Sequence, residues 1–317
     1  DRNYTNKQQY QSVFLKEYNL QIQEKKYENA KRLLYIYGNV LFANDHYDSI
    51  FCKTNVDFIN RNFPIKQDTL LSWNYYFLEY QNEKTSDFDK AIFWGKKAID
   101  SNPEKKSAVY VKTLCALGVV NSYIYENEKA INYFLEAIPI AEEKKDYRQL
   151  GSLYNNIAYA YEGVFANNES KKNYKKAAYY FLKAKDTSNY FALQTTFAYN
   201  HFNISRDTLQ TIKLIDSVFS VFNKFKKPVE MDQCNADFTS AFKYFLLKDY
   251  DKALNYLDKS SAFYIKTNNL DFLKYNTCLK IQINFQKDKT IKDQKAVELL
   301  ANDLFENESF TESMDLY

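Results

Sequence analysis

Two stretches of the sequence, one directly after the other between residues 111 and 186, repeat one pattern of small and large apolar residues. Within each stretch these residues recur three, four or seven positions apart, a spacing that places them on one face of an α-helix. The pattern consists of Leu114, Leu117, Gly118, then Ala130, Phe134, Ala137, and again of Tyr154, Ile157, Ala158, Tyr161, then Ala177, Phe181, Ala184. Small residues let a partner helix approach and the aromatic ring fills the remaining space, so each stretch predicts a pair of packed helices.

This pattern resembles the tetratricopeptide repeat, a helix–turn–helix unit that stacks into a superhelix. The resemblance implies an all-α fold, a right-handed superhelical solenoid of about seven such hairpins in one continuous domain. The hairpins are expected within 27–305, at residues 27–63, 67–103, 108–144, 147–187, 190–226, 231–267 and 271–305. Residues 1–25 are expected to form an N-terminal tail and a capping helix, and residues 306–317 the truncated start of a further helix.

The small residues also predict the register of the second helices. In the first hairpin, Ser49 and Val56 stand where later hairpins carry alanine. In the third, Ala130 follows the small residue of the first helix after 12 positions, whereas in the fourth Ala177 follows it after 19. The additional 7 residues predict a surface insertion near 164–173.

Composition excludes several classes of fold and partner. The chain has 5 glycines and 4 prolines, too few for a sandwich or barrel with many tight turns. The net charge of +3 gives no general case for nucleic acid or an anionic membrane, so no nucleic-acid partner is expected for this region. The 18% aromatic content fits either an AT-rich genome or an aromatic-lined binding groove.

No residue pattern typical of catalysis stands out. The four cysteines form no CxxC pair, and the two histidines, His46 and His201, lie in separate hairpins, so no metal site is expected. The scattered glycines provide no phosphate-binding loop. We therefore expect no catalytic residue, no metal, no cofactor and no enzymatic activity.

The resemblance implies that the first helix of each hairpin lines a concave groove that binds a protein or peptide. Mapped residue by residue, the groove positions are Cys115, Val119, Ser122, Tyr123, Asn155, Tyr159, Glu162, Thr195, Tyr199, Phe202, Phe238, Phe242 and Phe245. Two alternatives stay open for the phenylalanines of the sixth hairpin: they hold an apolar partner, or they pack against a neighbouring helix. Cys115, Asn155, Thr195 and Phe238 include no basic residue, so the carboxylate clamp of some members of this family is not expected.

The motif Tyr154–Tyr159 is similar to repeats that precede a membrane span and an output domain in bacterial regulators. The chain begins at Asp1 instead of methionine, and we expect it to be part of something longer. No run approaches 18 apolar residues, so no membrane span is expected within the chain. The resulting hypothesis is a ligand-sensing region of a signalling or transcription regulator, with an extracytoplasmic location favoured over a cytoplasmic one. The alternatives are a stand-alone scaffold or adaptor and a peptide-responsive regulator.

Overall fold

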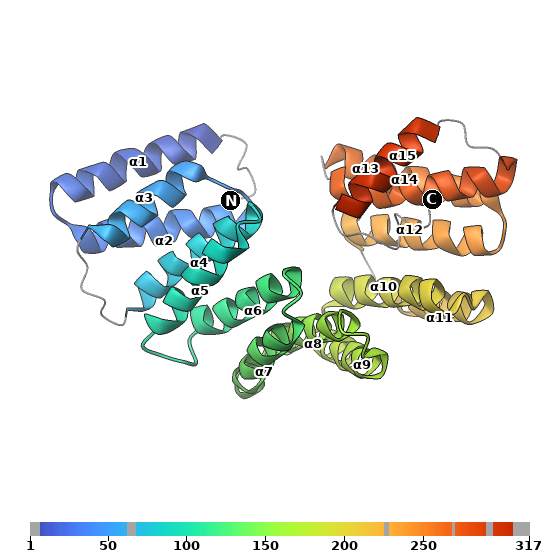
Figure 1. Ribbon diagram of the computed structural model, residues 1–317, viewed down its shortest axis with the longest axis horizontal. Coiled ribbons are helices and arrows are strands. Elements are labelled where there is room, and N and C mark those ends of the chain that lie inside the picture. The colour runs from blue at the N-terminus through green and yellow to red at the C-terminus, as the bar shows by residue number, and fades with distance from the viewer. Residues whose placement is uncertain (1–6, 62–67, 225–227, 268–269, 290–293, 307–317) are drawn as a thin grey trace. The chain divides into compact units, whose positions relative to one another are not determined.

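The computed structural model describes residues 7–61, 68–224, 228–267, 270–289 and 294–306, which form helices and contain no strand (Figure 1). The helices along these residues are α1 (Lys7–Gln23), α2 (Tyr27–Ala43), α3 (Ser49–Asn60), α4 (Thr69–Lys84), α5 (Phe88–Asp100), α6 (Ala108–Tyr123), α7 (Asn127–Glu143), α8 (Tyr147–Glu162), α9 (Asn167–Lys183), α10 (Thr187–Ser205), α11 (Thr208–Phe222), α12 (Glu230–Leu246), α13 (Tyr250–Lys266), α14 (Leu270–Asp288) and α15 (Gln294–Glu306). The predicted all-α helical-repeat fold is confirmed, whereas the handedness of the superhelix stays a prediction. The further helix expected at 306–317 falls, beyond Glu306, outside the described residues.

The chain divides into two compact units, an N-terminal unit of residues 1–180 and a C-terminal unit of residues 181–317. The boundary lies within α9, in a segment whose sequence has no linker composition. The sequence predicted one continuous domain because a division inside a helix leaves no proline, glycine or polar run to mark it. Within the described residues, no helix combines the length and the apolar composition that a membrane crossing requires.

Several pairs of successive helices are joined by short turns that share one design. After α7 the backbone of Lys145 is left-handed, with φ of 53°. The next N–H, that of Asp146, donates to the carbonyl of Ala141 at 2.9 Å, and the N–H of Lys145 donates to Glu142 at 3.0 Å, the two bonds of a Schellman motif. The Asp146 carboxylate then accepts the N–H of Gln149 and caps α8. One residue therefore ends the first helix and begins the second.

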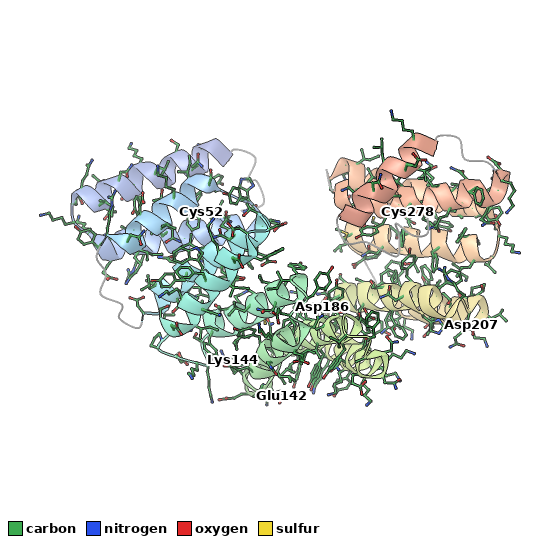
Figure 2. The ribbon with its side chains drawn as sticks, in the orientation of Figure 1. Cys52, Glu142, Lys144, Asp186, Asp207 and Cys278 are labelled. Carbon is green, nitrogen blue, oxygen red and sulfur yellow. The ribbon has the colours of Figure 1, made fainter. Side chains whose placement is uncertain are left out.

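An aspartate caps the start of many of the helices. Asp186 and Asp207, both labelled in Figure 2, accept the N–H groups of Asn189 and Gln210 at the starts of α10 and α11. The same role belongs to Asp48, Asp68, Asp87, Asp146 and Asp249. Each leaves its carboxylate near the positive end of the helix dipole, where an acidic residue stabilises the helix.

Small residues allow the close packing that the sequence pattern predicted. A methyl group added at Gly118 in α6 would overlap the ring of Phe134 in α7. Ala130 and Ala137 of α7 are fully buried beside that ring. The Phe134 ring therefore takes the volume that a side chain at position 118 would need.

The predicted insertion near residues 164–173 is wrong. Only residues 163–166 separate α8 from α9, and α9 begins 40 residues after α7. Ser170 and Tyr174 are buried and take the places of Ala130 and Phe134, so Ala177 corresponds to Ala137. The additional residues belong to the helix and form its first two turns.

The register predicted for the second helix of the first hairpin is also wrong. Ser49 is exposed and Val56 is only partly buried, although both were expected at small contact positions. α3 instead buries Phe51, Asn55 and Phe58. Phe51 packs against Phe14 of α1, and Phe58 packs against Tyr18 of the same helix.

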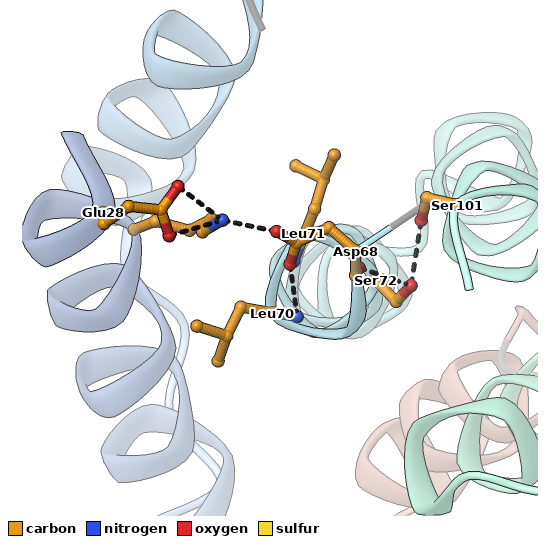
Figure 3. A network of polar contacts seen from close by, with 7 residues as sticks. Glu28, Asp68, Leu70, Leu71, Ser72 and Ser101 are labelled. Atoms are coloured by element: carbon orange, nitrogen blue, oxygen red, sulfur yellow. Dashed lines mark hydrogen bonds and ion pairs between the residues drawn. The ribbon is translucent and has the colours of Figure 1, made fainter. Parts of the chain in front are cut away.

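A buried lysine joins α2 to the start of α4. The Nζ atom of Lys31 lies 2.5 Å from Asp68 and 2.9 Å from the exposed Glu28 (Figure 3). Asp68 also accepts the N–H groups of Leu70 and Leu71 as the cap of α4. One carboxylate therefore fixes the beginning of a helix and its contact with the preceding hairpin.

Candidate functional site

The first helices of successive hairpins contact one another in the N-terminal unit, α2 with α4, α4 with α6 and α6 with α8. We call the surface formed by Glu83 of α4, Tyr123 of α6, and Asn155, Tyr159 and Glu162 of α8 the first-helix face. Four of these five residues were predicted from the sequence as groove positions, and Glu83 was not. They come from three helices that the short turns bring into adjacent positions.

Two tyrosine side chains on this face are exposed. Tyr123 is 46% exposed and Tyr159 is 57% exposed. The centre of the Tyr123 ring lies 5.7 Å from that of Phe88 at the start of α5, and this contact supports the tyrosine ring. Burial of its hydroxyl, Glu83 and Tyr159 together raise the pKa of Tyr123, with burial the largest cause. An exposed tyrosine offers a large rigid ring and a hydroxyl at low entropic cost, as in many protein-binding surfaces.

Glu83 lies one helical turn after a second, fully buried carboxyl. Neither oxygen of Glu79 has a hydrogen-bond partner in the described part of the chain, and its side chain packs where α5 has Gly95. Burial, with a smaller effect of Glu83, raises the pKa of Glu79 well above its ordinary value. Burial also raises the pKa of Glu83 to about 7, while Lys84 lowers it and Asp45 raises it. At neutral pH, Glu79 of α4 is therefore protonated and neutral, and Glu83 is partly ionised.

Glu162 closes the other side of the face. It accepts hydrogen bonds from the hydroxyls of Tyr174 at 3.1 Å and Ser170 at 3.3 Å, both on α9. Burial raises its pKa, and these two donors partly offset the rise. The carboxylate is oriented by α9 yet forms no ion pair within the described residues. Asn155, further along α8, is half-buried, and its amide donates to Asn156 at 3.4 Å.

Cys115 of α6 is partly buried and is not a reactive thiol. Gln149 Nε2 donates to its sulfur at 3.1 Å, and burial raises the pKa of the thiol to about 12. A thiol so far from ionisation is a poor nucleophile. Val119 and Ser122, predicted beside it, are partly buried, and the Ser122 hydroxyl donates to the Gly118 carbonyl.

The two turns at the end of α6 and α8 add an apolar patch that the sequence did not predict. A methyl group on Gly163 would lie 2.6 Å from the amide nitrogen of Asn127, so the two turns touch. We call their exposed side chains the turn patch: Ile124, Tyr125, Val164 and Phe165. Tyr125 and Phe165 have left-handed backbones, with φ of 60° and 58°. These two positions are equivalent to Lys145 in the turn after α7, so the left-handed backbone belongs to the turn and places both side chains at its surface.

The candidate residues of the C-terminal unit form a packed cluster. Phe242 of α12 was predicted on the groove face, yet it is only 4% exposed and is not open to a partner. Its ring lies 5.1 Å from Tyr199 and 5.6 Å from Phe202, both on α10. Phe238 lies 6.4 Å from Tyr199, and Phe245 packs on the same core. The physical reason is that α10 and α12 pack directly against each other.

His201 and Thr195 lie within hydrogen-bonding distance of neighbouring hydroxyl groups. His201 Nδ1 lies 3.2 Å from the hydroxyls of both Thr211 and Ser205. The Thr195 hydroxyl accepts a hydrogen bond from Thr239 at 3.2 Å. Among the residues with described positions, no group of three His, Cys, Asp or Glu side chains converges as a metal site would require.

The sequence matches no protein-family model and no curated protein. Solved structures match the fold. Aspartyl phosphate phosphatase F from Bacillus subtilis has a TM-score of 0.59 and 14% identity, over 96% of this chain and 91% of that one. A signal transduction ATPase with numerous domains and a tetratricopeptide repeat sensor, from Pyrococcus horikoshii, has a TM-score of 0.57 and 14% identity, over 99% of this chain and 49% of that one. The apo form of RapI has a TM-score of 0.54 and 11% identity, over 98% and 95%. The chain therefore has the fold of tetratricopeptide-like helical-repeat proteins.

Proposed function

We propose that this chain is a non-catalytic repeat domain that binds a protein or peptide on its first-helix face. The observation that carries the proposal is the exposure of two large rings, Tyr123 and Tyr159, on two first helices in contact. The turn patch extends this surface with four further apolar side chains. Large exposed apolar and aromatic side chains near one another commonly mark an interaction site.

The finer proposal is that the domain is the ligand-sensing region of a larger bacterial signalling or transcription regulator. Its support is the fold: the matched ATPase from Pyrococcus horikoshii is described as having a tetratricopeptide repeat sensor, and the chain covers 49% of that protein. A stand-alone scaffold would use the same face. The two differ in the size of the native protein. A native band well above 37.6 kDa supports the sensor, and a band near 37.6 kDa contradicts it.

The binding function is tested with an immobilised chain and a displayed library of random dodecapeptides. We expect peptides to be enriched by the wild-type chain and lost with Tyr123→Ala and Tyr159→Ala. Tyr179→Ala is the matched control, because Tyr179 has an exposure of 57% but lies on α9, a second helix. Enrichment that Tyr179→Ala abolishes and the other two variants leave intact would place binding elsewhere.

A further inference from the structure

Each exposed ring of the first-helix face has a carboxyl group nearby. Glu83 is close enough to Tyr123 to raise the pKa of its hydroxyl. Glu162 follows Tyr159 by three residues on α8, a spacing that places both on one side of the helix. Burial, Glu162 and, to a smaller extent, Tyr159 raise the pKa of Tyr174, whose hydroxyl donates a hydrogen bond to Glu162. Tyr123 of α6 thus has Glu83 of the neighbouring α4 nearby, and Tyr159 shares one side of α8 with Glu162.

Neither carboxylate is neutralised by a cation of the described chain. Lys84, the lysine that lowers the pKa of Glu83, has its Nζ atom 2.7 Å from Asp45 and is already paired. In the part of the chain that the structure describes, the hydrogen bonds that Glu162 accepts come from the hydroxyls of Ser170 and Tyr174. Hydroxyl donors orient the Glu162 carboxylate without neutralising it, and Glu83 gains its negative charge as pH rises through about 7.

We propose that this face binds a basic peptide segment, with an arginine or lysine side chain held against the Tyr123 and Tyr159 rings and paired with Glu83 and Glu162. The inference rests on the proposed function and names the chemistry of its partner. A cation over an aromatic ring is attracted by the ring quadrupole, and guanidinium or ammonium donors form their strongest hydrogen bonds with carboxylates.

The turn patch indicates what the rest of the segment contains. Val164 and Phe165 follow Glu162 after one glycine, so a cation at Glu162 places the neighbouring side chains of the peptide over apolar surface. Apolar side chains next to the basic residue would cover that surface and remove it from water. The occupant is therefore a basic segment flanked by apolar residues, and an acidic segment would meet repulsion at both ends.

The half-buried position of Glu83 links such binding to pH. Burial and Asp45 favour the neutral carboxyl, and Lys84 opposes them, which places its pKa at about 7. A bound cation favours the ionised form, so binding releases a proton from Glu83. Affinity for the basic segment should therefore increase between pH 6 and pH 8.

The test uses four synthetic nonapeptide mixtures, each randomised except for a central Arg, Lys, Leu or Glu, applied separately to the immobilised chain. Retained peptide is quantified by mass spectrometry. We expect the Arg and Lys mixtures to be retained about tenfold more than the Leu mixture, and the Glu mixture less than any other. Raising the salt concentration should reduce the Arg and Lys preference.

Variants test separately the contribution of the carboxylates, the contribution of the tyrosine ring and the integrity of the fold. Glu83→Gln with Glu162→Gln should reduce retention of the Arg mixture to the level of the Leu mixture, whereas Glu128→Gln, an exposed carboxyl on α7, should not. Tyr159→Phe should keep the preference because the ring remains, and Tyr159→Leu should lose it. Circular dichroism melts establish that each variant is folded. Equal retention of Arg, Lys and Leu mixtures would overturn the inference and leave the proposed function standing. Retention of no mixture above a blank surface would overturn both.

Discussion

The ammonium of Lys31 in α2 lies 2.5 Å from the carboxylate of Asp68, which caps α4 37 residues later. Lys31 is buried, so its charge depends on this partner. Asp68→Asn should lower the free energy of unfolding by about 2 kcal/mol, because it leaves a buried ammonium with only the exposed Glu28 carboxylate. Lys31→Met should cost less, since Asp68 keeps its two N–H donors. Urea titrations measure both.

Lys129→Met is the control for this pair, because Lys129 pairs with Glu126 on the surface. It should change the unfolding free energy by less than about 0.5 kcal/mol. If Asp68→Asn and Lys129→Met cost the same, the buried pair does not hold α2 to α4.

Buried carboxyls make the stability of the N-terminal unit depend on pH. Glu79 keeps its proton in the folded state, whereas an unfolded glutamate ionises near pH 4.3. The free energy of unfolding is therefore highest below that pH. Above it the free energy of unfolding falls by about 1.4 kcal/mol per pH unit for each such group, until the folded group also ionises. For Glu83 the loss should end near pH 7, where the folded group also ionises.

Urea unfolding of the wild type and of Glu79→Gln at pH 5, 6, 7 and 8 checks this account. The advantage of Glu79→Gln over the wild type should grow with pH. Parallel curves for the two proteins across this range would mean that Glu79 is ionised in the folded chain.

The left-handed turn residues offer a stabilising change. Lys145 and Lys185 have φ of 53° and 56°, a conformation that glycine adopts without steric cost. Lys145→Gly and Lys185→Gly should each raise the unfolding free energy by about 0.5 kcal/mol or more. Lys175→Gly, in the middle of α9, should lower it by about 1 kcal/mol. Thermal melts that show all three variants losing stability equally would contradict the turn geometry.

The close contact of Gly118 with Phe134 predicts a coupled pair. Gly118→Ala should cost about 1–3 kcal/mol because the methyl group overlaps the ring. Phe134→Leu alone loses the aromatic packing, but in the double variant the smaller side chain makes room for the methyl group. The double-mutant cycle should show a favourable coupling of about 1 kcal/mol. Strictly additive costs would show that the two residues do not compete for space.

The sequence predicted the helical repeats because their small and aromatic residues recur at helical spacing. It misplaced α9 because seven residues are almost two full helical turns, so Ala177 looks equivalent to Ala130 when it corresponds to Ala137. At α5 and α13 an aspartate cap precedes the buried small residue by four positions, at Ala91 and Ala253, whereas Ala166 precedes α9 and gives no such mark.

The candidate site combines residues that the sequence indicated with residues that it did not, and the binding role of both stays a prediction. Tyr159 and Glu162 follow from the face that a first helix presents in such repeats. Glu83 and its buried neighbour Glu79 were missed, because sequence patterns assign charged residues to solvent. Phe242 was predicted in the groove because periodicity identifies a face and does not tell whether another helix covers it.

The most direct test of the binding function is hydrogen–deuterium exchange of the chain alone and with the peptide that it retains most strongly. We expect slowed exchange within residues 119–126 of α6 and its turn and 155–166 of α8 and its turn, with Tyr159→Ala removing the effect. Slowed exchange confined to α7, α9 or the C-terminal unit would contradict the assignment of the first-helix face as the binding surface.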